Sequence, residues 1–140
     1  MRLPLVALTL LIGCSNGPRS SPEGSVESYY DAANDQDFEA MVSILAPESL
    51  KRIGSKEKAV AHLQASFDGW SDFDIDVEDV RLDTSEKTGV VQFTCRAKVF
   101  FQKDRKHHPA GCNDLWSVIR QDDGRWYVVL PEAQRLKPML

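Results

Sequence analysis

The stretch "VVQFTCRAKVFF" at residues 90–101 carries the clearest structural signal in the chain. Apolar and polar side chains alternate along most of it, which is typical of a half-buried β-strand. The inward-facing positions are Val91, Phe93, Cys95, Ala97, Val99 and Phe101. A strand this long usually curves, because strands twist. We therefore expect a bent sheet that wraps around a core.

The segment before this strand, residues 73–82, predicts a neighbouring strand that contains a bulge. Two apolar series alternate there, out of phase with each other: Phe73, Ile75 and Val77, then Val80 and Leu82. One extra residue near Glu78 and Asp79 explains the change of phase. The strand is expected to bend at that point.

The segments after it predict a third and a fourth strand. The third is "CNDLWSVIR" at residues 112–120, and the fourth is "RWYVVL" at residues 125–130. The turn "DDG" at residues 122–124 joins them as a tight hairpin. Four antiparallel strands are therefore expected.

Three short amphipathic helices are predicted before the strands, with Ser25, Asp37 and Ser55 as their N-caps. Their inward residues at helical spacing are Val26, Tyr29, Tyr30 and Ala33, then Phe38, Met41, Val42 and Leu45, then Val60, Leu63, Phe67 and Trp70. The intervening "ESLKRI" at residues 48–53 is interpreted as an irregular or helical turn. The predicted fold class is α+β, with three N-terminal helices packed on a curved four-stranded antiparallel sheet.

These segments together resemble the NTF2-like superfamily, a cone-shaped α+β fold also called cystatin-like, and its SnoaL-type members. The resemblance is carried by "VESYYDAANDQDFEAMVSILAPE" at residues 26–48, "GSKEKAVAHL" at residues 54–63 and "DDGRWYVV" at residues 122–129. It implies one domain over residues 25–131, followed by a C-terminal tail at 132–140. It also implies a pocket between the helices and the concave face of the sheet.

The resemblance suggests which residues would line that pocket. The candidates are Tyr29, Tyr30, Trp70, Trp116 and Trp126. Ketosteroid isomerase-like enzymes of this fold place a Tyr and one or two carboxylic acids in the pocket. Here Asp74, Asp76 or Asp114 could supply the carboxylate, but Asp74 and Asp76 alternate with apolar residues and are expected to face solvent.

Tyr residues on an apolar helix face usually belong to the core, so we favour a non-enzymatic binding or interaction domain that needs no cofactor. The alternative is a ketosteroid isomerase-like or SnoaL-like enzyme that acts on a small apolar substrate. For the non-enzymatic domain the expected partner is a small apolar ligand or an envelope protein. A homodimer formed through the sheet face is a further alternative.

The N-terminus has the features of an exported, lipid-anchored protein. Residues 1–13 begin with a positive charge and continue as an apolar run too short to span a bilayer. The ending Leu11, Ile12, Gly13 and Cys14 resembles the lipobox of bacterial lipoproteins. By that resemblance Cys14 is acylated and anchors the chain in the bilayer, and residues 14–24 form a tether. Ser15 favours the outer membrane, facing the periplasm, in an organism with two membranes.

With Cys14 assigned to the lipid, Cys95 and Cys112 remain, and an exported protein meets oxidising conditions in which they can pair. Directly opposed cysteines would fix the strand register, placing Val91 opposite Trp116 and the hairpin turn at Lys103 and Asp104. If "RKHHPAG" at residues 105–111 forms the loop instead, the cysteines are offset and too far apart to join.

Charge and histidine content restrict the remaining possibilities. Seventeen Lys and Arg oppose 21 Asp and Glu, for a net charge of −4, which offers no broad basic surface for nucleic acid. His107 and His108 are neighbours and would point to opposite faces of a strand, so no metal site is expected. Lys103, Arg105 and Lys106 form a local basic spot, expected at a solvated hairpin tip near acidic headgroups.

Overall fold

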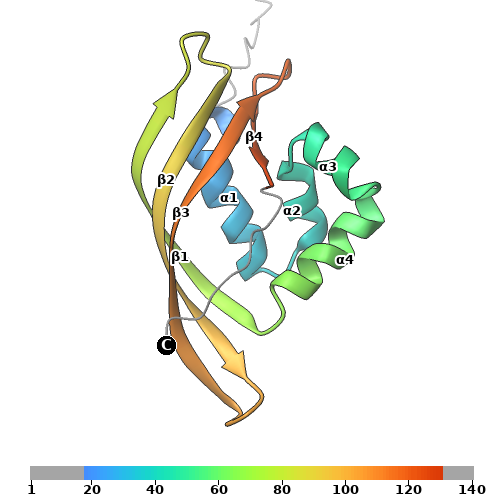
Figure 1. Cartoon of the computed structure of the whole chain (residues 1–140), viewed down its shortest axis with the longest axis vertical. Coiled ribbons are helices and arrows are strands. Elements are labelled where there is room, and N and C mark those ends of the chain that lie inside the picture. The colour runs from blue at the N-terminus through green and yellow to red at the C-terminus, as the bar shows by residue number, and fades with distance from the viewer. Residues whose placement is uncertain (1–17, 131–140) are drawn as a thin grey trace, which may run out of the picture.

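The computed structural model describes residues 18–130, and the predicted α+β class is confirmed (Figure 1). A 3-10 helix and four α-helices come first: η1 (Pro18–Ser20), α1 (Pro22–Asn34), α2 (Phe38–Ile44), α3 (Pro47–Ile53) and α4 (Lys56–Ser66). The strands follow: β1 (Trp70–Leu82), β2 (Thr88–Phe101), β3 (Lys106–Arg120) and β4 (Trp126–Val129). The helices lie on one side of the sheet.

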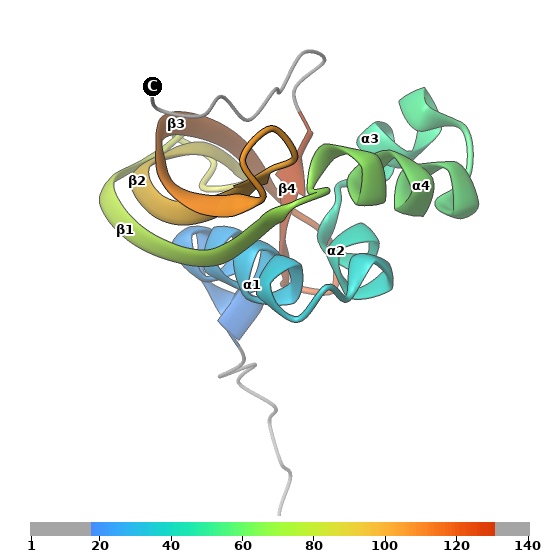
Figure 2. The ribbon, with the colours of Figure 1, turned by 90° about the horizontal axis from the view of Figure 1, so that it is seen from below.

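The four strands form an antiparallel sheet in the order β1-β2-β3-β4. Figure 2 shows the strong curvature of β1, β2 and β3, with α1 lying alongside β1 and with α3 and α4 to one side. Beyond β4, Leu45 forms a parallel bridge with Val128, and the Ala46 N–H donates to the Val128 carbonyl over 2.8 Å. The segment between α2 and α3 thus protects the edge of the short β4.

The predicted register of the central hairpin is confirmed. Cys95 lies opposite Cys112 and Val91 opposite Trp116, so the turn falls at residues 102–105. The alternative, with residues 105–111 as a loop, is wrong because β3 already begins at Lys106. Pro109 is tolerated in this strand because β4 pairs only with residues 117–120. At Pro109 the side of β3 away from β2 has no neighbouring strand, so the missing N–H removes no ladder hydrogen bond.

The bulge predicted near Glu78 is confirmed by a register shift between Val77 and Asp79. A second shift, between Ser71 and Asp74, was not predicted, and Asp72 within it has a φ of 58°. Asn34, the last residue of α1, compensates for the interrupted ladder. Its Nδ2 donates to the Phe73 carbonyl over 2.8 Å, and its Oδ1 accepts from the Phe73 N–H over 2.6 Å.

The helices required two corrections. Helix α1 begins at Pro22 with Ser21 as its cap, so the predicted cap Ser25 is wrong; Ser25 is buried inside the helix, where its Oγ donates to the Pro22 carbonyl. Proline at the first helical position, preceded by serine, is the stronger start signal. The segment interpreted as an irregular or helical turn is helix α3, so residues 18–130 contain four α-helices where three were predicted. The predicted caps Asp37 and Ser55 are confirmed.

The start of α1 also shortens the predicted tether, because residues 18–24 belong to η1 and α1.

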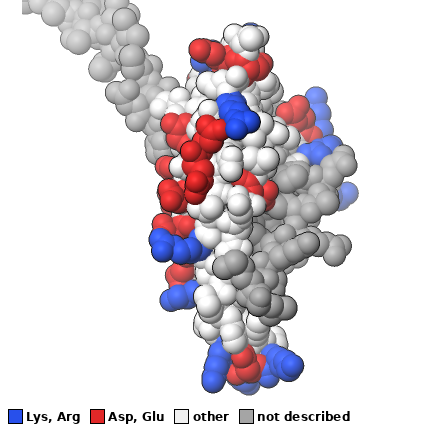
Figure 3. Space-filling model, turned by 60° about the vertical axis from the view of Figure 1, so that its left-hand side comes forward, with Lys and Arg blue, Asp and Glu red and all other residues white. Residues whose placement is uncertain are grey.

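The side of the sheet away from α1, called here the outer face, carries closely spaced opposite charges. Arg96 and Asp74 are 2.9 Å apart and Lys98 and Asp72 are 3.5 Å apart. Figure 3 shows acidic and basic side chains interspersed on this part of the surface. Exposed pairs of this kind add little stability, but they discourage edge-to-edge pairing of β1 with another strand.

Candidate functional site

The interior of the cone, where the sequence predicts a pocket, is filled by aromatic rings. Tyr29 and Trp116 are fully buried, with ring centroids 4.7 Å apart. Tyr30 is also buried and lies 5.6 Å from Phe93 and 5.2 Å from Phe73, measured between ring centroids. Side chains at such distances are in contact. The space between α1 and the sheet is therefore packed core.

The structure places the other two predicted pocket residues at the margins of this core. Trp126 is buried at the start of β4. Trp70 is half-buried at the start of β1 and stacks on Phe73, with ring centroids 6.2 Å apart and planes 18° apart. The structure therefore brings together Tyr29, Tyr30 and Trp116. Trp70 lies apart from them at the start of β1, and Trp126 lies at the start of β4. Ligand binding by these five residues stays a prediction.

Two hydrogen-bond donors inside the core have no partner among the described residues. They are the Tyr29 hydroxyl and Trp116 Nε1, on rings that touch each other. Burial, reinforced by the neighbouring Tyr30, raises the pKa of Tyr29 well above its ordinary value. The phenol therefore stays protonated at physiological pH and keeps its proton to donate. Chemically, the pair could stabilise a developing oxyanion, but only if a substrate reached it.

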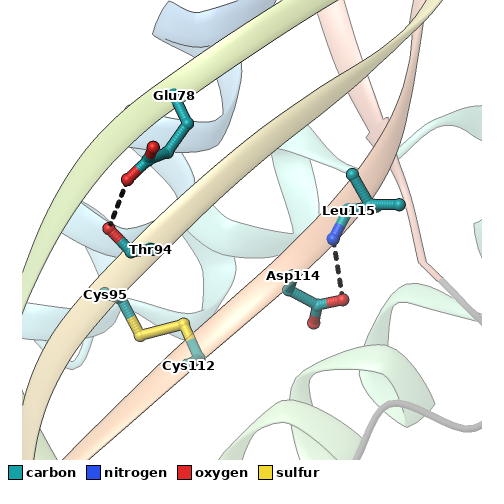
Figure 4. Close-up of a disulfide and its surroundings, with 6 residues drawn as sticks. All are labelled: Glu78, Thr94, Cys95, Cys112, Asp114 and Leu115. Atoms are coloured by element: carbon teal, nitrogen blue, oxygen red, sulfur yellow. Dashed lines mark hydrogen bonds between the residues drawn. A yellow bond between two sulfur atoms is a disulfide. The ribbon is translucent and has the colours of Figure 1, made fainter.

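The three candidate carboxylates lie in different environments. Asp74 and Asp76 are exposed, as predicted, and Asp74 is paired with Arg96 on the outer face. Asp114 shares the α1-facing side of β3 with Trp116, two residues further along, and is half-buried. Its Oδ1 accepts a hydrogen bond of 2.8 Å from the Leu115 N–H (Figure 4). The buried polar residues within 18–130 are Ser25 and Ser49, so none of the carboxylates described there is buried.

The predicted disulfide is present in the structure and joins the middle of β2 to β3 (Figure 4). Cys95 and Cys112 are directly opposed, with Cα atoms 4.9 Å apart, within the range that the bond requires. Cys95 is buried and Cys112 is half-buried. The bridge lies on the α1-facing side, close to where the covered part of the hairpin gives way to its projecting end.

Two hollows lie at the surface. One, of about 390 Å³, is on the outer face beside α3 and is lined by Glu48, Arg52, Leu115, Ser117, Val129 and Leu130. Leu115 is 60% exposed, an unusual position for a large apolar side chain. Sequence reasoning missed this surface, although an apolar residue on the polar face of a strand was a usable signal. The other hollow, of about 450 Å³, lies near the turn between β2 and β3.

Other predicted sites lie outside the structure or show no cluster. Cys14 and the tail at 132–140 are outside the described residues. Within residues 18–130, no three His, Cys, Asp or Glu side chains are grouped so that they could hold a metal ion. In the same part of the chain, none of the helices combines the length and apolar character needed to cross a bilayer.

Comparison with protein families shows the family to which this domain belongs. Residues 21–131 match the family described as NTF2-like N-terminal transpeptidase domain. The chain belongs to this family. The NTF2-like family accounts for the curved sheet, the helix α1 in its concavity and the closing β3–β4 hairpin. None of the curated proteins with which the sequence was compared matches it significantly.

Several solved structures share the fold at low identity. A ketosteroid isomerase-like protein from Erwinia carotovora atroseptica SCRI1043 has 17% identity and a TM-score of 0.61, covering 81% of this chain and 92% of its own. A SnoaL-like polyketide cyclase from Shewanella denitrificans OS-217 has 13% identity and a TM-score of 0.52, covering 77% and 87%. A calcium/calmodulin-dependent protein kinase type II association domain from Thiobacillus denitrificans ATCC 25259 has 10% identity and a TM-score of 0.55, covering 78% of this chain and 90% of its own. At these identities the likeness shows the fold alone.

Proposed function

We propose that this protein is a lipid-anchored envelope protein whose NTF2-like domain is a non-enzymatic interaction module. The observation that carries the proposal is the filled interior: Tyr29, Tyr30 and Trp116 occupy the place where a substrate would bind. A ligand site of ordinary size needs a cavity of about 300–1,000 Å³. The two hollows described above, of about 390 and 450 Å³, lie at the surface and not in this interior.

The arrangement of acids and donors supports the same conclusion. Proton abstraction next to a carbonyl needs a base within hydrogen-bond reach of the substrate and a donor for the resulting oxyanion. The Tyr29 hydroxyl is sealed in the core, whereas Asp114 is half-buried and accepts a hydrogen bond from the Leu115 N–H. The family description places these domains at the N-terminus of transpeptidases. We infer that here, too, the domain positions partners and that bond chemistry is done elsewhere.

The outer face of the sheet offers a surface for a protein partner. Leu115 and Val90 are large apolar side chains exposed on that face, and Leu115 also lines the hollow beside α3. Exposed apolar residues next to a hollow are typical of interaction sites. An envelope protein is the favoured occupant, and a second copy of this chain is the alternative. Sedimentation equilibrium of the wild type and of Leu115→Asp separates the two, since a homodimer would dissociate in the variant without any other protein.

The lipid anchor is tested directly at Cys14. The mature N-terminal peptide is expected to carry acyl chains by mass spectrometry, and the protein is expected in the membrane fraction. Two or three chains hold a protein stably because each buried methylene contributes about 0.8 kcal/mol. The full-length Cys14→Ala variant should lose the acyl mass and the membrane association. An unmodified Cys14 in the wild type would overturn the anchoring.

The absence of a ligand in the interior is tested by native mass spectrometry of the acylated full chain released from neutral detergent. Tyr29→Phe is the matched control, because it removes only the buried hydroxyl. Both proteins are expected to carry no small molecule beyond their own acyl chains. A copurifying apolar molecule that is present in the wild type and lost in Tyr29→Phe would show an open, hydroxyl-lined site and overturn the proposal.

A second candidate function rests on the unpartnered donors of Tyr29 and Trp116, which resemble a preformed oxyanion site. In that case the protein would be an isomerase-like enzyme, and Asp114 would be the base. The assay is conversion of a Δ5-3-ketosteroid to its conjugated isomer, followed by ultraviolet absorbance. Under the favoured proposal, the wild type and Asp114→Asn give the same background rate. A wild-type rate that falls at least 100-fold in Asp114→Asn would establish the enzyme instead.

A further inference from the structure

The end of the β2–β3 hairpin projects beyond the rest of the sheet (Figure 1). The last pair that β1 makes with β2 is Trp70 with Val99, and beyond the hydrogen bond from the Phe100 N–H to the Gly69 carbonyl the hairpin strands pair only with each other. The turn is nevertheless well defined. The Arg105 N–H donates to the Phe101 carbonyl over 2.8 Å, and the Lys106 N–H donates to Asp104 Oδ1 over 3.0 Å. We call residues 98–109 the hairpin tip.

The hairpin tip is basic in a protein of net negative charge. Lys103, Arg105 and Lys106 are exposed, and none has an ion-pair partner within residues 18–130. The one acid in the turn, Asp104, is engaged by His108 Nε2 at 2.5 Å. Figure 3 shows basic side chains flanking the acidic one at the lower end of the molecule. The three cations are therefore available to an anionic partner.

Two pairs of rings pack behind these cations, one pair on each face of the hairpin. His107 packs on Phe100 with ring centroids 5.2 Å apart, and His108 stacks on Phe101 at 4.7 Å with planes 29° apart. Both histidines line the hollow of about 450 Å³, together with Asp72, Lys98 and Pro109. Side chains already held by stacking lose little entropy on binding. The hollow thus offers the His107 ring and polar groups on the outer face, close to the turn that carries the cations.

The position of the tip relative to the N-terminus indicates where its partner lies. The first described residues are at the opposite end of the sheet (Figure 1). Arg19 fixes them to β4: its Nε donates to the Trp126 carbonyl over 3.3 Å, and its guanidinium lies 4.2 Å from the centroid of the Tyr127 ring. Pro18 is the fourth residue after Cys14, so an acylated Cys14 holds this end within about 14 Å of the lipid.

The length of the hairpin sets how far the tip can lie from the anchoring bilayer. β2 has 14 residues, and at about 3.3 Å per residue it spans roughly 45 Å. Headgroup charge is screened over about 8 Å at physiological ionic strength. A domain standing upright on its anchor would hold the tip several screening lengths from the anchoring surface, and contact of the tip with acidic headgroups stays a prediction.

We propose that the hairpin tip binds an acidic glycan of the envelope, a polysaccharide that carries carboxylate or phosphate groups on its sugars. Lys103, Arg105 and Lys106 contact the anionic groups, and a sugar ring occupies the hollow against His107. This inference rests on the proposed lipid anchoring and on a domain that stands upright on that anchor, and it names a partner of the tethered module. The contacts at the tip require no change in the fold.

The test is binding of polygalacturonate, a soluble carboxylated polysaccharide, to the acylated full chain in neutral detergent micelles. The charge variant is K103Q/R105Q/K106Q, and its matched control is K56Q/K58Q/K87Q, which removes three exposed cations from α4 and the β1–β2 turn. At about 50 mM salt, each cation of the tip is expected to contribute about fivefold, so the tip variant loses roughly 100-fold in affinity and the control little. H107A should lose about tenfold without changing the salt dependence.

The outcomes separate this inference from the anchoring on which it rests. Acylation of Cys14 is measured by mass on the same samples, so a failed anchor is seen independently of binding. Equal losses in the tip variant and the control would overturn the inference, because net charge alone would then explain binding. Tighter binding of the unacylated Cys14→Ala chain to vesicles of phosphatidylglycerol and phosphatidylcholine than to polygalacturonate would also overturn it, in favour of a lipid partner. Unchanged thermal midpoints show that the variants fold.

Discussion

The two halves of the β2–β3 hairpin differ although they belong to the same two strands. In the covered half, Phe93 and Trp116 are fully buried against the aromatic rings of α1. In the hairpin tip no helix covers the strands, and the rings of Phe100 and Phe101 pack instead on histidines beside exposed cations. The covered half must hold the fold together, whereas the tip is free to carry a binding surface because the core does not depend on it.

The largest expected effect breaks the covered half. Trp116→Ala removes a fully buried ring at the centre of the aromatic cluster. Replacing a buried Trp by Ala usually costs about 3–5 kcal/mol, because a cavity is left as well as lost transfer energy. Lys103→Ala in the exposed tip should change the free energy of unfolding by less than about 0.5 kcal/mol. Urea unfolding followed by far-ultraviolet circular dichroism measures both.

The contrast between the halves would be wrong if Trp116→Ala cost less than about 1 kcal/mol, a value typical of surface positions. The interior would then be loosely filled, and the case for a non-enzymatic domain would weaken. Trp70→Ala sharpens the comparison, because Trp70 is half-buried and stacks only at the margin of the cluster. Its loss in stability should fall between those of the other two variants.

The disulfide gives the next largest effect, because it joins the two halves. Cys95 and Cys112 are separated by 17 residues, and closing a loop of that size stabilises the folded state by about 3 kcal/mol in the chain-entropy model. Thermal unfolding with and without reductant measures the loss, and C95A/C112A should be insensitive to reductant. Hydrogen exchange after reduction should rise more at residues 96–111 than in the covered half. A uniform rise would show that the bridge holds the whole sheet, not the tip.

The strands could be predicted from the sequence because strict alternation and register leave few choices. In β2 a shift of one residue would turn Phe93 and Val91 out to solvent. The assumption that Cys95 faces Cys112 then fixed every pair of the hairpin, and the structure has that register. The bulge at Glu78 could also be predicted, since a change of phase in the apolar pattern has few other causes.

The parts that were missed depend on tertiary context. The serine at position 25 looked like a cap because an apolar helix face begins at Val26, but Ser21 followed by Pro22 starts α1 a turn earlier. The extension of β3 to Lys106 contains Pro109, which argues against a strand unless that strand lacks a neighbour on one side. Only the shortness of β4 reveals that it does. No local pattern could supply this information.

The candidate site was predicted in part. The sequence grouped Tyr29, Tyr30 and Trp116 on inward faces, and the structure brings them together. Whether such residues line a pocket or fill it depends on volumes supplied by several elements, which the sequence of one helix does not contain. The hollow at the tip could not be predicted for a related reason. His107 and Lys98 become neighbours only through the register of β2 and β3.

A smaller effect is expected at the junction of α1 and β1. Asn34 makes two hydrogen bonds to the backbone of Phe73, of 2.8 and 2.6 Å, in place of a neighbouring strand. Asn34→Ala leaves that N–H and carbonyl without their partner and should cost about 1–2 kcal/mol in urea unfolding. Asn34→Asp is the matched control, since it keeps the acceptor but loses the donor, and it should cost less. Equal stability of Asn34→Ala and the wild type would show that the bulge at Asp72 needs no support from the helix.

The smallest effect contrasts the turns at the two ends of the sheet. In the β1–β2 turn, hydrogen bonds from Thr88 and Ser85 lower the pKa of Asp83 to about 2, whereas in the unfolded chain the value is about 3.9. A depressed folded pKa stabilises the protein above about pH 4 and loses that stabilisation as the pH falls to about 2. Asp83→Asn should therefore be less stable than the wild type at pH 7 and equal to it near pH 2.

At the hairpin tip, burial would raise the pKa of Asp104, but the hydrogen bonds from His108 and the Lys106 N–H outweigh it and lower the pKa. Because His108 is itself a partner of this acid, Asp104→Asn should also alter binding of the polysaccharide, whereas Asp83→Asn should alter only stability. A change in binding in Asp83→Asn would show that the two ends are coupled, and the division of labour between them would have to be abandoned.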